Sequence, residues 1–375
     1  MQAVADLPRR LHAWRRLCCW PPITYLFTEQ RSFFVISKVT TLSRSNFAIN
    51  PLTDRFGRSI TYARIAVTSA CNLRCAYCLS EEHHADLPQS HPMSIGDMER
   101  LVSTLARLGI NKIRFTGGEP LLRGDIAELV GIAKRTPGIQ TVSLTTNGVL
   151  LHRHIDALLD AGLDSLNLSI DTLDRERYRA ITRRDSFGQV SANLQTLLER
   201  QVMPVKLNVV MMRGINSDEI CRFMEFTRDH PVTVRFMELQ PFDDHQIWRT
   251  GKFLGLEKIR ELLCEAYPDL ASRRGASTEY YSFALPGYRG SAAIIPAYTR
   301  NFCHECNRIR ITADGTVISC LYDKHGVALL PLLRKQAGFE EIAALFMLAA
   351  KEKPENGRRD GEGGNLRTSM SEIGG

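Results

Sequence analysis

No stretch of this 375-residue sequence approaches the ~20 consecutive apolar residues that a transmembrane helix needs. We therefore expect a soluble protein without a membrane partner. A Gly-x-Gly-x-x-Gly pattern also follows none of the predicted strands, so the sequence does not support a dinucleotide-binding fold. Hydrophobic residues make up 44% and charged residues 24%, a balance typical of a globular chain with a large core.

Net positive charge is scarce outside the first 50 residues. That segment contains seven basic and two acidic side chains, so it carries five of the seven net positive charges. Residues 51–375 are nearly neutral overall, whereas a protein that binds duplex nucleic acid through its phosphates needs a strongly basic surface. We therefore expect no nucleic-acid partner.

Residues 1–50 are rich in arginine and poor in acidic residues, which is typical of an organellar transit peptide. Pro21 and Pro22 interrupt the short apolar stretch Leu17–Phe27, so a secretory signal peptide fits less well. We predict a leader over residues 1–50 and a location in the mitochondrial matrix. A plastid location and an unprocessed cytosolic extension stay open.

From residue 61 onward, short β-branched runs alternate with longer amphipathic patterns, and each pair has the length of one βαβ unit. This alternation predicts an α/β protein with parallel strands. The predicted strands are Ala63–Thr68, Lys112–Thr116, Thr141–Thr145, Ser165–Ser169, Lys206–Val210 and Thr233–Glu238. The predicted helices are Ser94–Leu108, Gly124–Arg135, Arg153–Ala161, Phe187–Arg200, Asn216–Asp229 and Phe339–Lys351.

Polar residues collect where the predicted strands end, as at Thr116–Glu119 and Ser169–Asp171. In β/α barrels the chemistry lies at the carboxyl ends of the strands. We therefore expect an incomplete, six-stranded β/α barrel over residues 51–240 rather than a doubly wound sheet. A smaller C-terminal cluster-binding module should follow over residues 241–350, and a flexible linker with a Gly-Gly tail over residues 351–375.

Three cysteines lie in the short loop after the first predicted strand: Cys71, Cys75 and Cys78. Zinc sites usually have four ligands, often from paired C-x₂-C units. Three thiolates suit a [4Fe–4S] cluster that leaves one iron open to an external ligand. The pattern therefore predicts a catalytic cluster. The isolated Cys221 and Cys264 are expected to be small buried side chains.

Cys303, Cys306 and Cys320 form a second group of three thiols. One interpretation is a zinc site completed by His304 or His325. The other is a second cluster with an open iron. The spacing leaves both open.

The first cysteine loop, with Tyr77 before its last cysteine, resembles the signature of the radical S-adenosylmethionine superfamily. Thr116–Pro120 resembles that superfamily's Gly-Gly-Glu-Pro element, whose glycines would let a backbone carbonyl approach the methionine ammonium. Three further segments are similar to the GTP 3′,8-cyclase family of molybdenum-cofactor biosynthesis: Asp54–Arg58, Cys306–Gly315 and Gly374-Gly375.

This resemblance implies two [4Fe–4S] clusters and S-adenosylmethionine as cofactors, and GTP as substrate. In that family an adenosyl radical removes hydrogen from the ribose 3′ carbon, and the carbon radical attacks C8 of guanine. The product is (8S)-3′,8-cyclo-7,8-dihydroguanosine 5′-triphosphate. The implied partners are cyclic pyranopterin monophosphate synthase, which acts on the product, and an electron donor. The sequence leaves a homodimer open.

The resemblance also implies site residues. Cluster ligands would be the six cysteines of the two groups, and Arg308 and Arg310 would be catalytic together with the first three. Arginine suits a triphosphate because its guanidinium binds oxyanions in a bidentate way. The residues implied for S-adenosylmethionine are Tyr77, Gly118, Ser169 and Gln240. Those implied for the substrate are Arg64, Arg114, Thr145, Lys206, Arg308, Ile309 and Arg310.

The sequence departs from the family pattern at three places without losing a ligand. Gln240 replaces a methionine beside the adenosine, Ser69-Ala70 replaces Asp-Arg, and Ser80 replaces a proline. A linker followed by Gly-Gly also suggests that Gly374 and Gly375 insert into the barrel mouth; a frayed terminus is the alternative.

Three other functions were weighed against the cyclase. A radical enzyme that modifies peptides would usually have more C-terminal cysteines than the three present. A non-catalytic, zinc-stabilised interaction protein would bind zinc without iron or sulfide. A protein conjugated through its Gly-Gly terminus is disfavoured by the long α/β body and both cysteine groups.

Overall fold

The computed structural model describes residues 51–78, 93–240, 250–274, 281–299, 303–323, 326–357 and 370–374. The chain divides into Met1–Arg44 and Ser45–Gly375, and all described residues belong to the second part. The predicted leader therefore lies outside the described residues. In the described part of the chain, no helix is long and apolar enough to cross a membrane.

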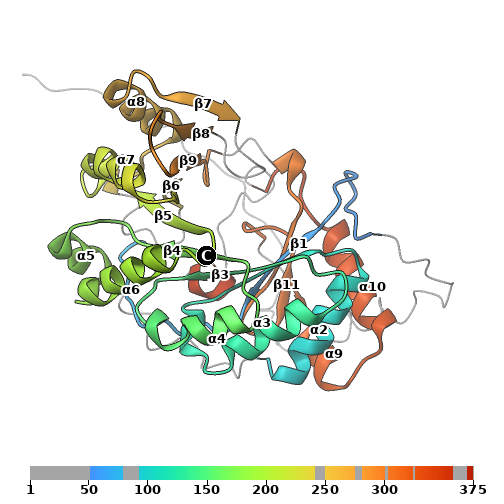
Figure 1. Ribbon diagram of the computed structural model, residues 1–375. Helices are drawn as coiled ribbons and strands as arrows, with labels where there is room; N and C mark the ends of the chain where they lie inside the picture. Colours follow the sequence, from blue (N-terminus) through green and yellow to red (C-terminus); the bar gives the residue numbers. More distant parts are fainter. Residues whose placement is uncertain are drawn as a thin grey trace, which may run out of the picture. The chain divides into compact units, whose positions relative to one another are not determined.

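The described strands form one twelve-stranded sheet (Figure 1). They are β1 (Tyr62–Ala66), β2 (Lys112–Thr116), β3 (Thr141–Thr146), β4 (Ser165–Ser169), β5 (Val205–Met211), β6 (Val232–Glu238), β7 (Ala271–Arg274), β8 (Tyr281–Ala284), β9 (Ser291–Ile295), β10 (Arg308–Ile311), β11 (Thr316–Ile318) and β12 (Val327–Ala328). Their order is β12-β11-β10-β1-β2-β3-β4-β5-β6-β9-β8-β7. Pairing is parallel from β10 to β9 and antiparallel at both ends.

The predicted α/β arrangement with parallel strands is confirmed. The six predicted strands correspond to β1–β6, each with bounds that differ by two residues or fewer. Six strands are nevertheless only half of the sheet. The C-terminal strands β10 and β9 pair parallel with β1 and β6, so this part of the chain extends the same sheet at both ends.

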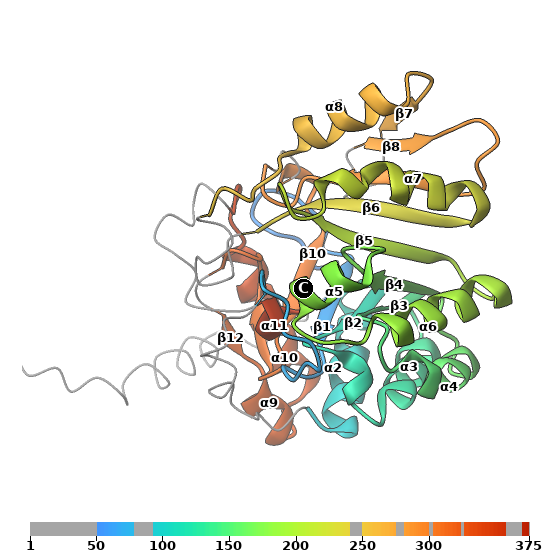
Figure 2. The same ribbon diagram turned by 90° about the vertical axis from the view of Figure 1, so that its left-hand side faces the viewer.

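Helices connect the successive parallel strands from β1 to β6 and cover one face of the sheet (Figures 1 and 2). The connecting helices are α2 (Ile95–Arg107), α3 (Ile126–Arg135), α4 (Ile155–Asp160), α5 (Arg175–Thr182), α6 (Phe187–Arg200) and α7 (Ile220–Asp229). Later in the chain come α8 (Leu256–Ala266), α9 (Leu330–Arg334), α10 (Phe339–Lys351) and α11 (Met370–Ile373). The sequence did not predict α5, because half of its residues RERYRAIT are charged. Its start is set by Asp174, whose carboxylate accepts from the Arg177 amide at 2.8 Å.

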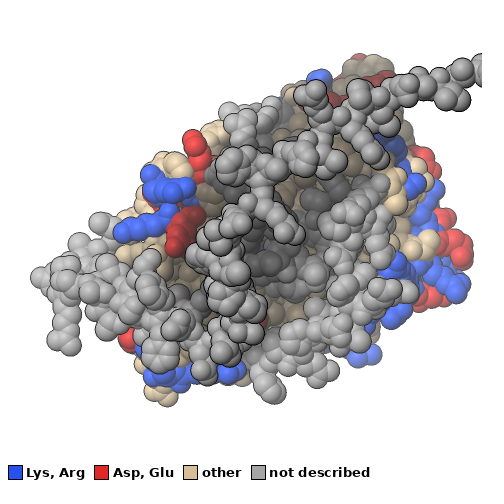
Figure 3. All heavy atoms as spheres, turned by 180° about the vertical axis from the view of Figure 1, so that it is seen from behind, with Lys and Arg blue, Asp and Glu red and all other residues tan. Residues whose placement is uncertain are grey.

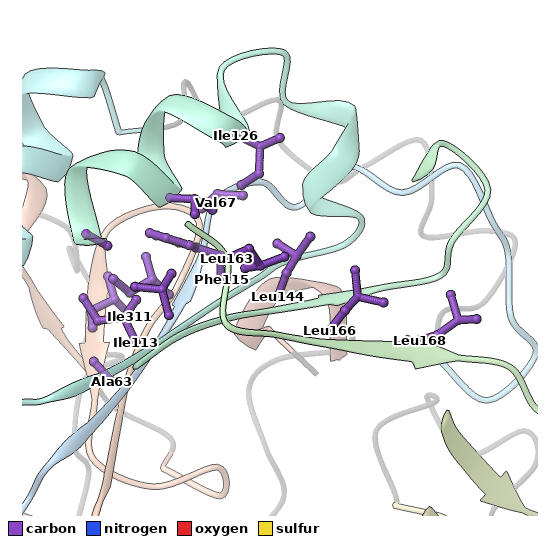
Figure 4. Packing of buried hydrophobic residues seen from close by; sticks show 14 of the residues in the cluster. Ala63, Val67, Ile113, Phe115, Ile126, Leu144, Leu163, Leu166, Leu168 and Ile311 are labelled. Carbon is purple, nitrogen blue, oxygen red and sulfur yellow. The ribbon is translucent and has the colours of Figure 1, made fainter. Parts of the chain in front are cut away.

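Side chains alternate across the parallel strands, and the two faces of the sheet differ sharply. On the face that the helices cover, residues such as Phe115, Leu144 and Leu166 are fully buried and point toward the helices (Figure 4). They pack with Ile126 of α3 in one hydrophobic core. The opposite face carries polar and cationic side chains instead, and it forms the candidate site.

Phe236 of β6 tests the contribution of this core. It is 0% exposed and packs edge-to-face on Phe223 of α7, with ring centroids 6.3 Å apart. We expect Phe236→Ala to lower the free energy of unfolding by ~3–5 kcal/mol because it leaves a cavity. Urea unfolding followed by circular dichroism measures this loss. Val202→Ala, at a residue that is 50% exposed, should change it by less than ~0.5 kcal/mol. Equal effects of the two substitutions would contradict the packing argument.

Candidate active site

The first cysteine loop follows β1 and rests on the end of α5. The amides of Arg74 and Ala76 donate to the carbonyls of Thr182 and Ile181, both at 2.9 Å. Within the loop, the Cys78 amide donates to the Cys75 carbonyl at 2.9 Å and closes a tight turn. The helix that sequence analysis missed therefore supports the predicted cluster loop.

A buried carboxylate joins this loop to the neighbouring strands. Glu119 is 0% exposed and accepts from the Thr146 hydroxyl at 2.6 Å and from the Asn147 amide at 2.7 Å. Burial raises the pKa of Glu119 to about 7. The Asn147 side chain in turn donates to Asn72 at 2.7 Å and reaches Cys71 Sγ at 3.9 Å. Burial also raises the pKa of the Cys71 thiol to about 12, so iron binding would have to displace a proton.

Gly117 and Gly118 are needed because two loops touch at this point. A Cβ on Gly117 would lie 2.3 Å from the Thr68 carbonyl oxygen, and one on Gly118 would lie 2.2 Å from that of Ala70. Gly117 also has φ +150°. The amides of Gly118 and Glu119 donate to these same two carbonyls at 2.8 Å. The structure therefore assigns the glycines to contact with the chain just before Cys71.

Tyr77 is fixed from the opposite side of the cysteine loop. Its hydroxyl donates to Asp171 Oδ2 at 2.7 Å, and Asp171 Oδ1 accepts from the Val210 amide at 2.8 Å. Burial raises the pKa of Asp171 to about 6. Asn216 donates to the Asp171 carbonyl at 2.7 Å and holds this corner to the end of β5.

Four predicted substrate arginines lie on three adjacent strands of the inner face. Arg64 of β1 is in register with Arg114 of β2 on one side and Arg310 of β10 on the other. Two residues earlier, Tyr62 is in register with Arg308. Because alternate residues of a strand share a face, all five side chains lie on the same side of the sheet.

Tyr62 and Thr145 hold the Arg114 guanidinium in place. Arg114 Nε donates to the Tyr62 hydroxyl at 2.6 Å, and Nη1 donates to Thr145 Oγ1 at 3.1 Å. Sequence analysis did not identify Tyr62. Its signal was its position two residues before Arg64, on the same face of the strand.

The crowding of positive charge shifts the pKa values of its members. Burial, followed by the charge of Arg310, lowers the pKa of Arg64 well below its usual value. Burial alone would raise the pKa of Tyr62, but the charges of Arg114, Arg64 and Arg308 outweigh it and lower this pKa to about 7. Such a surface favours a ligand with several negative charges.

The C-terminal tail reaches this cationic face. Arg310 Nη1 donates to the Gly374 carbonyl at 2.8 Å. Gly374 has φ +69°, and a Cβ there would lie 2.5 Å from Thr116 Cγ2 and 3.3 Å from Ala66 Cβ. Ile373 is buried beside Ile318 and Leu321. Figure 2 shows α11 next to β1. Gly375 lies outside the described residues.

The remaining predicted site residues fall into two groups. The side chain of Ile309 is buried in the hydrophobic core, so it lies on the opposite face from Arg308 and Arg310. The other group is half-buried. Ser169 lies on the inner side of β4, Lys206 lies on the inner side of β5, and Gln240 follows β6.

Two further polar residues beside Ser169 were missed by sequence analysis. Asn208 is in register with Ser169 and accepts from Arg235 Nε at 3.0 Å and from Nη2 at 2.6 Å. Asn208 lies two residues after Lys206 on β5, and Arg235 lies opposite Asn208 on β6. This alternate-residue spacing is the signal that could have identified Asn208 and Arg235.

Cys303 and Cys306 of the second group lie in and directly after the short helix η6 (Cys303–Glu305), and Cys320 follows β11. The Cys306 amide donates to the Cys303 carbonyl at 3.2 Å. Over the described ranges, no three His, Cys, Asp or Glu side chains form a group that could hold a single metal ion. Cys221 and Cys264 are exposed on α7 and α8, so the prediction that they are buried is wrong. Each faces away from the apolar stripe of its helix.

The sequence matches two known families. Residues 65–227 match the radical SAM superfamily, and residues 232–358 match Molybdenum Cofactor Synthesis C. The chain is 57% identical over 325 residues to a GTP 3′,8-cyclase of Chlorobaculum tepidum, across 86% of this chain and 97% of the relative. This chain belongs to the GTP 3′,8-cyclase family. The predicted resemblance is confirmed.

A more distant relative agrees with this assignment, and a solved structure shares the fold. The chain is 38% identical to a mitochondrial GTP 3′,8-cyclase of Arabidopsis thaliana, across 83% of this chain and 80% of the relative. Streptococcus suis SuiB bound to S-adenosylmethionine has a TM-score of 0.54 with 15% identity, across 74% of this chain and 66% of SuiB. At that identity the likeness shows the fold alone.

Lys and Arg side chains occur beside Asp and Glu side chains on the described part of the face in Figure 3. The visible charge is mixed in sign. The row of Arg64, Arg114 and Arg310 on the inner side of the sheet, by contrast, has a single sign and suits a small anionic ligand.

The low pKa of Tyr62 gives a direct test of the cationic face. We expect one tyrosine of the native protein to ionise near pH 7, as followed by tyrosinate absorbance, and this transition to be lost in Tyr62→Phe. Because the folded pKa lies below the unfolded value of ~10, ionisation adds stability as pH rises between these values. That gain is lost as pH falls through about 7. Tyr288→Phe serves as the control and should retain the transition. A native protein whose tyrosines all titrate near pH 10 or above would contradict the electrostatic argument.

Proposed function

We propose that this protein is a GTP 3′,8-cyclase that uses S-adenosylmethionine to convert GTP to (8S)-3′,8-cyclo-7,8-dihydroguanosine 5′-triphosphate, an early step of molybdopterin biosynthesis. The observation that carries the proposal is the row of Arg64, Arg114 and Arg310 on adjacent strands, of which the central strand β1 leads into the first cysteine loop. The Chlorobaculum relative has the same activity in its name. A purely structural zinc protein would have no use for such a row.

The first cysteine group fits an iron–sulfur cluster with S-adenosylmethionine. When bound, a reduced [4Fe–4S] cluster supplies the electron that cleaves S-adenosylmethionine to methionine and a 5′-deoxyadenosyl radical. Tyr77, Gly118 and Ser169 would contact S-adenosylmethionine; Tyr77 lies in the cysteine loop, and the Gly118 amide donates to Thr68 just before that loop. Gln240 donates to the Ala297 carbonyl at 3.2 Å, and its buried Oε1 has no hydrogen-bond partner in the described chain. We assign this oxygen to the adenine amino group, which would satisfy it.

The inner face fits a nucleoside triphosphate. Arg64, Arg114, Arg308 and Arg310 would bind the phosphate oxygens, with Thr145 and Lys206 further along the same face. The reaction moves one hydrogen atom from C3′ to the 5′-deoxyadenosyl radical, which becomes 5′-deoxyadenosine, and then forms the C3′–C8 bond. The cyclised purine radical then needs one electron and one proton to become the 7,8-dihydro product. With the electron that cleaves the cofactor, each turnover takes two electrons from the electron donor.

We further propose that Cys303, Cys306 and Cys320 bind a second [4Fe–4S] cluster whose open iron holds the purine. The zinc alternative is less suitable because His304 is exposed and lies 3.5 Å from Glu305 rather than with the three thiols. In this proposal residues 51–240 form the incomplete barrel that binds cofactor, and residues 241–350 form the module that binds the second cluster. His325 lies outside the described residues.

The cellular setting is a prediction from the sequence and the family. A cyclic pyranopterin monophosphate synthase would take the product. A mitochondrial-matrix location is supported by the composition of residues 1–50 and by the name of the Arabidopsis relative, whereas the Chlorobaculum relative is bacterial. A homodimer stays a prediction.

Anaerobic reconstitution of the full chain tests the function. We expect ~8 irons per chain from two clusters, with 5′-deoxyadenosine and the cyclised nucleotide formed in equal amounts when GTP is supplied. Cleavage of S-adenosylmethionine that GTP neither stimulates nor couples to product would assign the radical chemistry to another substrate. Zinc in place of iron at both cysteine groups would support the interaction-protein alternative.

The Gly-Gly tail has its own test. Deletion of Gly374-Gly375 removes the nearer of the two tail carbonyls that Arg310 Nη1 contacts, Gly374 at 2.8 Å rather than Ile373 at 3.4 Å. We expect nucleotide product to fall at least ~10-fold while both clusters and basal cofactor cleavage persist. The matched substitution Gly374→Ala places a Cβ against Thr116 and should have a similar effect. Product formation at the native rate in both variants would show that the tail is a dispensable terminus.

A further inference from the structure

The segment Lys353–Gly357 directly follows α10 and lies against the second cysteine group. Its composition predicts a flexible linker, yet two of its five residues are buried. Lys353 is 2% exposed and Gly357 is also buried. Residues 358–364 of the predicted linker lie outside the described part of the chain.

Arg58 connects this segment to Cys303. Its guanidinium donates to the Cys303 carbonyl at 2.5 Å, to the Pro354 carbonyl at 2.7 Å and to the Glu355 carbonyl at 3.2 Å. Asp54 balances the charge of Arg58 through an ion pair of 2.5 Å, and both side chains are buried. The Asp54–Arg58 turn therefore joins the first residue of the cysteine group to the segment after α10.

Lys353 binds the backbone beside the other two cysteines. Its Nζ donates to the Arg308 carbonyl at 2.8 Å and to the Ser319 carbonyl at 2.5 Å. Arg308 lies two residues after Cys306, and Ser319 directly precedes Cys320. No described carboxylate lies within ion-pair distance of Lys353. A buried ammonium that has only carbonyl partners favours a nearby anion, and three cluster thiolates would provide one.

The last two residues of the segment approach the sulfur atoms themselves. Asn356 Oδ1 lies 3.9 Å from Cys303 Sγ, within reach of a thiol hydrogen bond. A Cβ on Gly357 would lie only 2.2 Å from Cys320 Sγ. Glycine at this position is therefore required by the sulfur atom, since its φ needs no special residue.

We propose that residues 353–357 form a collar for the second cluster: Gly357 seats Cys320, and the Asn356 amide turns to donate a hydrogen bond to the Cys303 thiolate. The proposal rests on the proposed function, because it requires the second cluster. Which atom of an amide faces a sulfur depends on the protonation of that sulfur, so a thiolate would draw the Nδ2 donor toward itself. Hydrogen bonds to cluster sulfurs and exclusion of water tune the reduction potential.

The first test places a methyl group against Cys320. In the reconstituted full chain, we expect Gly357→Ala to halve the iron and sulfide per chain and to remove the second cluster's electron paramagnetic resonance signal. The first cluster's signal and uncoupled cofactor cleavage should persist. Gly188→Ala is the matched control, because a Cβ there meets nothing within 4 Å, and it should keep both clusters. Gly357→Ala with native iron content and both native signals would overturn the seat for Cys320.

The second test concerns the hydrogen bond and does not depend on whether Gly357→Ala folds. Asn356→Asp keeps the shape of the side chain but removes the donor and adds negative charge. We expect the second cluster's reduction potential to become more negative while the first cluster's stays unchanged. Signals are assigned with a variant that carries Cys71→Ser, Cys75→Ser and Cys78→Ser. An unchanged potential in Asn356→Asp would overturn the hydrogen bond.

The native protein separates this proposal from the one on which it rests. About four irons per native chain, or zinc on the second cysteine group, would mean that the second cluster itself is wrong, whatever the collar variants do. About eight irons in the native protein together with variants that match it in iron, signals and potential would reject the collar alone.

Discussion

Repulsion between like charges on one face of a sheet is the constraint on which this structure depends. Arg310, Arg64 and Arg114 stand in register on β10, β1 and β2, with Arg308 two residues away. Parallel strands lie only ~4.8 Å apart, so these guanidinium groups crowd one another. Burial, followed by the charge of Arg310, lowers the pKa of Arg64, and the charges of the arginines lower the pKa of Tyr62. The protein tolerates the crowding because the other face of the same strands is a large apolar core, and a polyanionic substrate would relieve it.

The buried carboxylates near the site do not relieve it. Glu119 and Asp171 accept hydrogen bonds from backbone amides and hydroxyl groups, at Thr146, Asn147 and Val210 among others. They serve to fix loops: Glu119 connects the glycine turn to Asn147 and so to Cys71, and Asp171 fixes Tyr77. The site thus separates two tasks. Acids and amides position the cysteine loop, and the arginines remain grouped on the inner face of the sheet.

Sequence analysis identified the regular part of the fold because that part repeats one pattern. Strands β1–β6 are β-branched runs between amphipathic helices, and their bounds were predicted to within two residues. The missed elements break the pattern for physical reasons. Half of the residues of helix α5 are charged, and its last carbonyls accept from amides of the cysteine loop. Strands β9 and β10 join edges formed far earlier in the chain, so only the tertiary pairing reveals them.

The site was predictable where chemistry required particular residue types at a fixed spacing, as in both cysteine groups. It was not predictable where a common residue gains its role from its neighbours. Tyr62 became a partner of Arg114 only when β1 and β2 were paired. Cys221 and Cys264 looked buried because their neighbours along the chain are apolar, but helical periodicity places them on the exposed side.

The C-terminal segment shows most clearly how composition can mislead. Gly, Pro, Lys and Glu predict a linker, yet Lys353 and Gly357 are buried because the backbone around the second cysteine group provides their partners. Strand β10, which starts at Arg308, also contacts the C-terminal tail. Lys353 binds the Arg308 carbonyl at the start of β10, and Gly374 accepts from the Arg310 side chain two residues later. Strand β10 is therefore held at adjacent points by two parts of the C-terminal chain, one beside the second cysteine group and one at the cationic face. A displacement of either part must move the arginines of β10, so the geometry of the cationic face depends on residues that never contact the first cysteine loop.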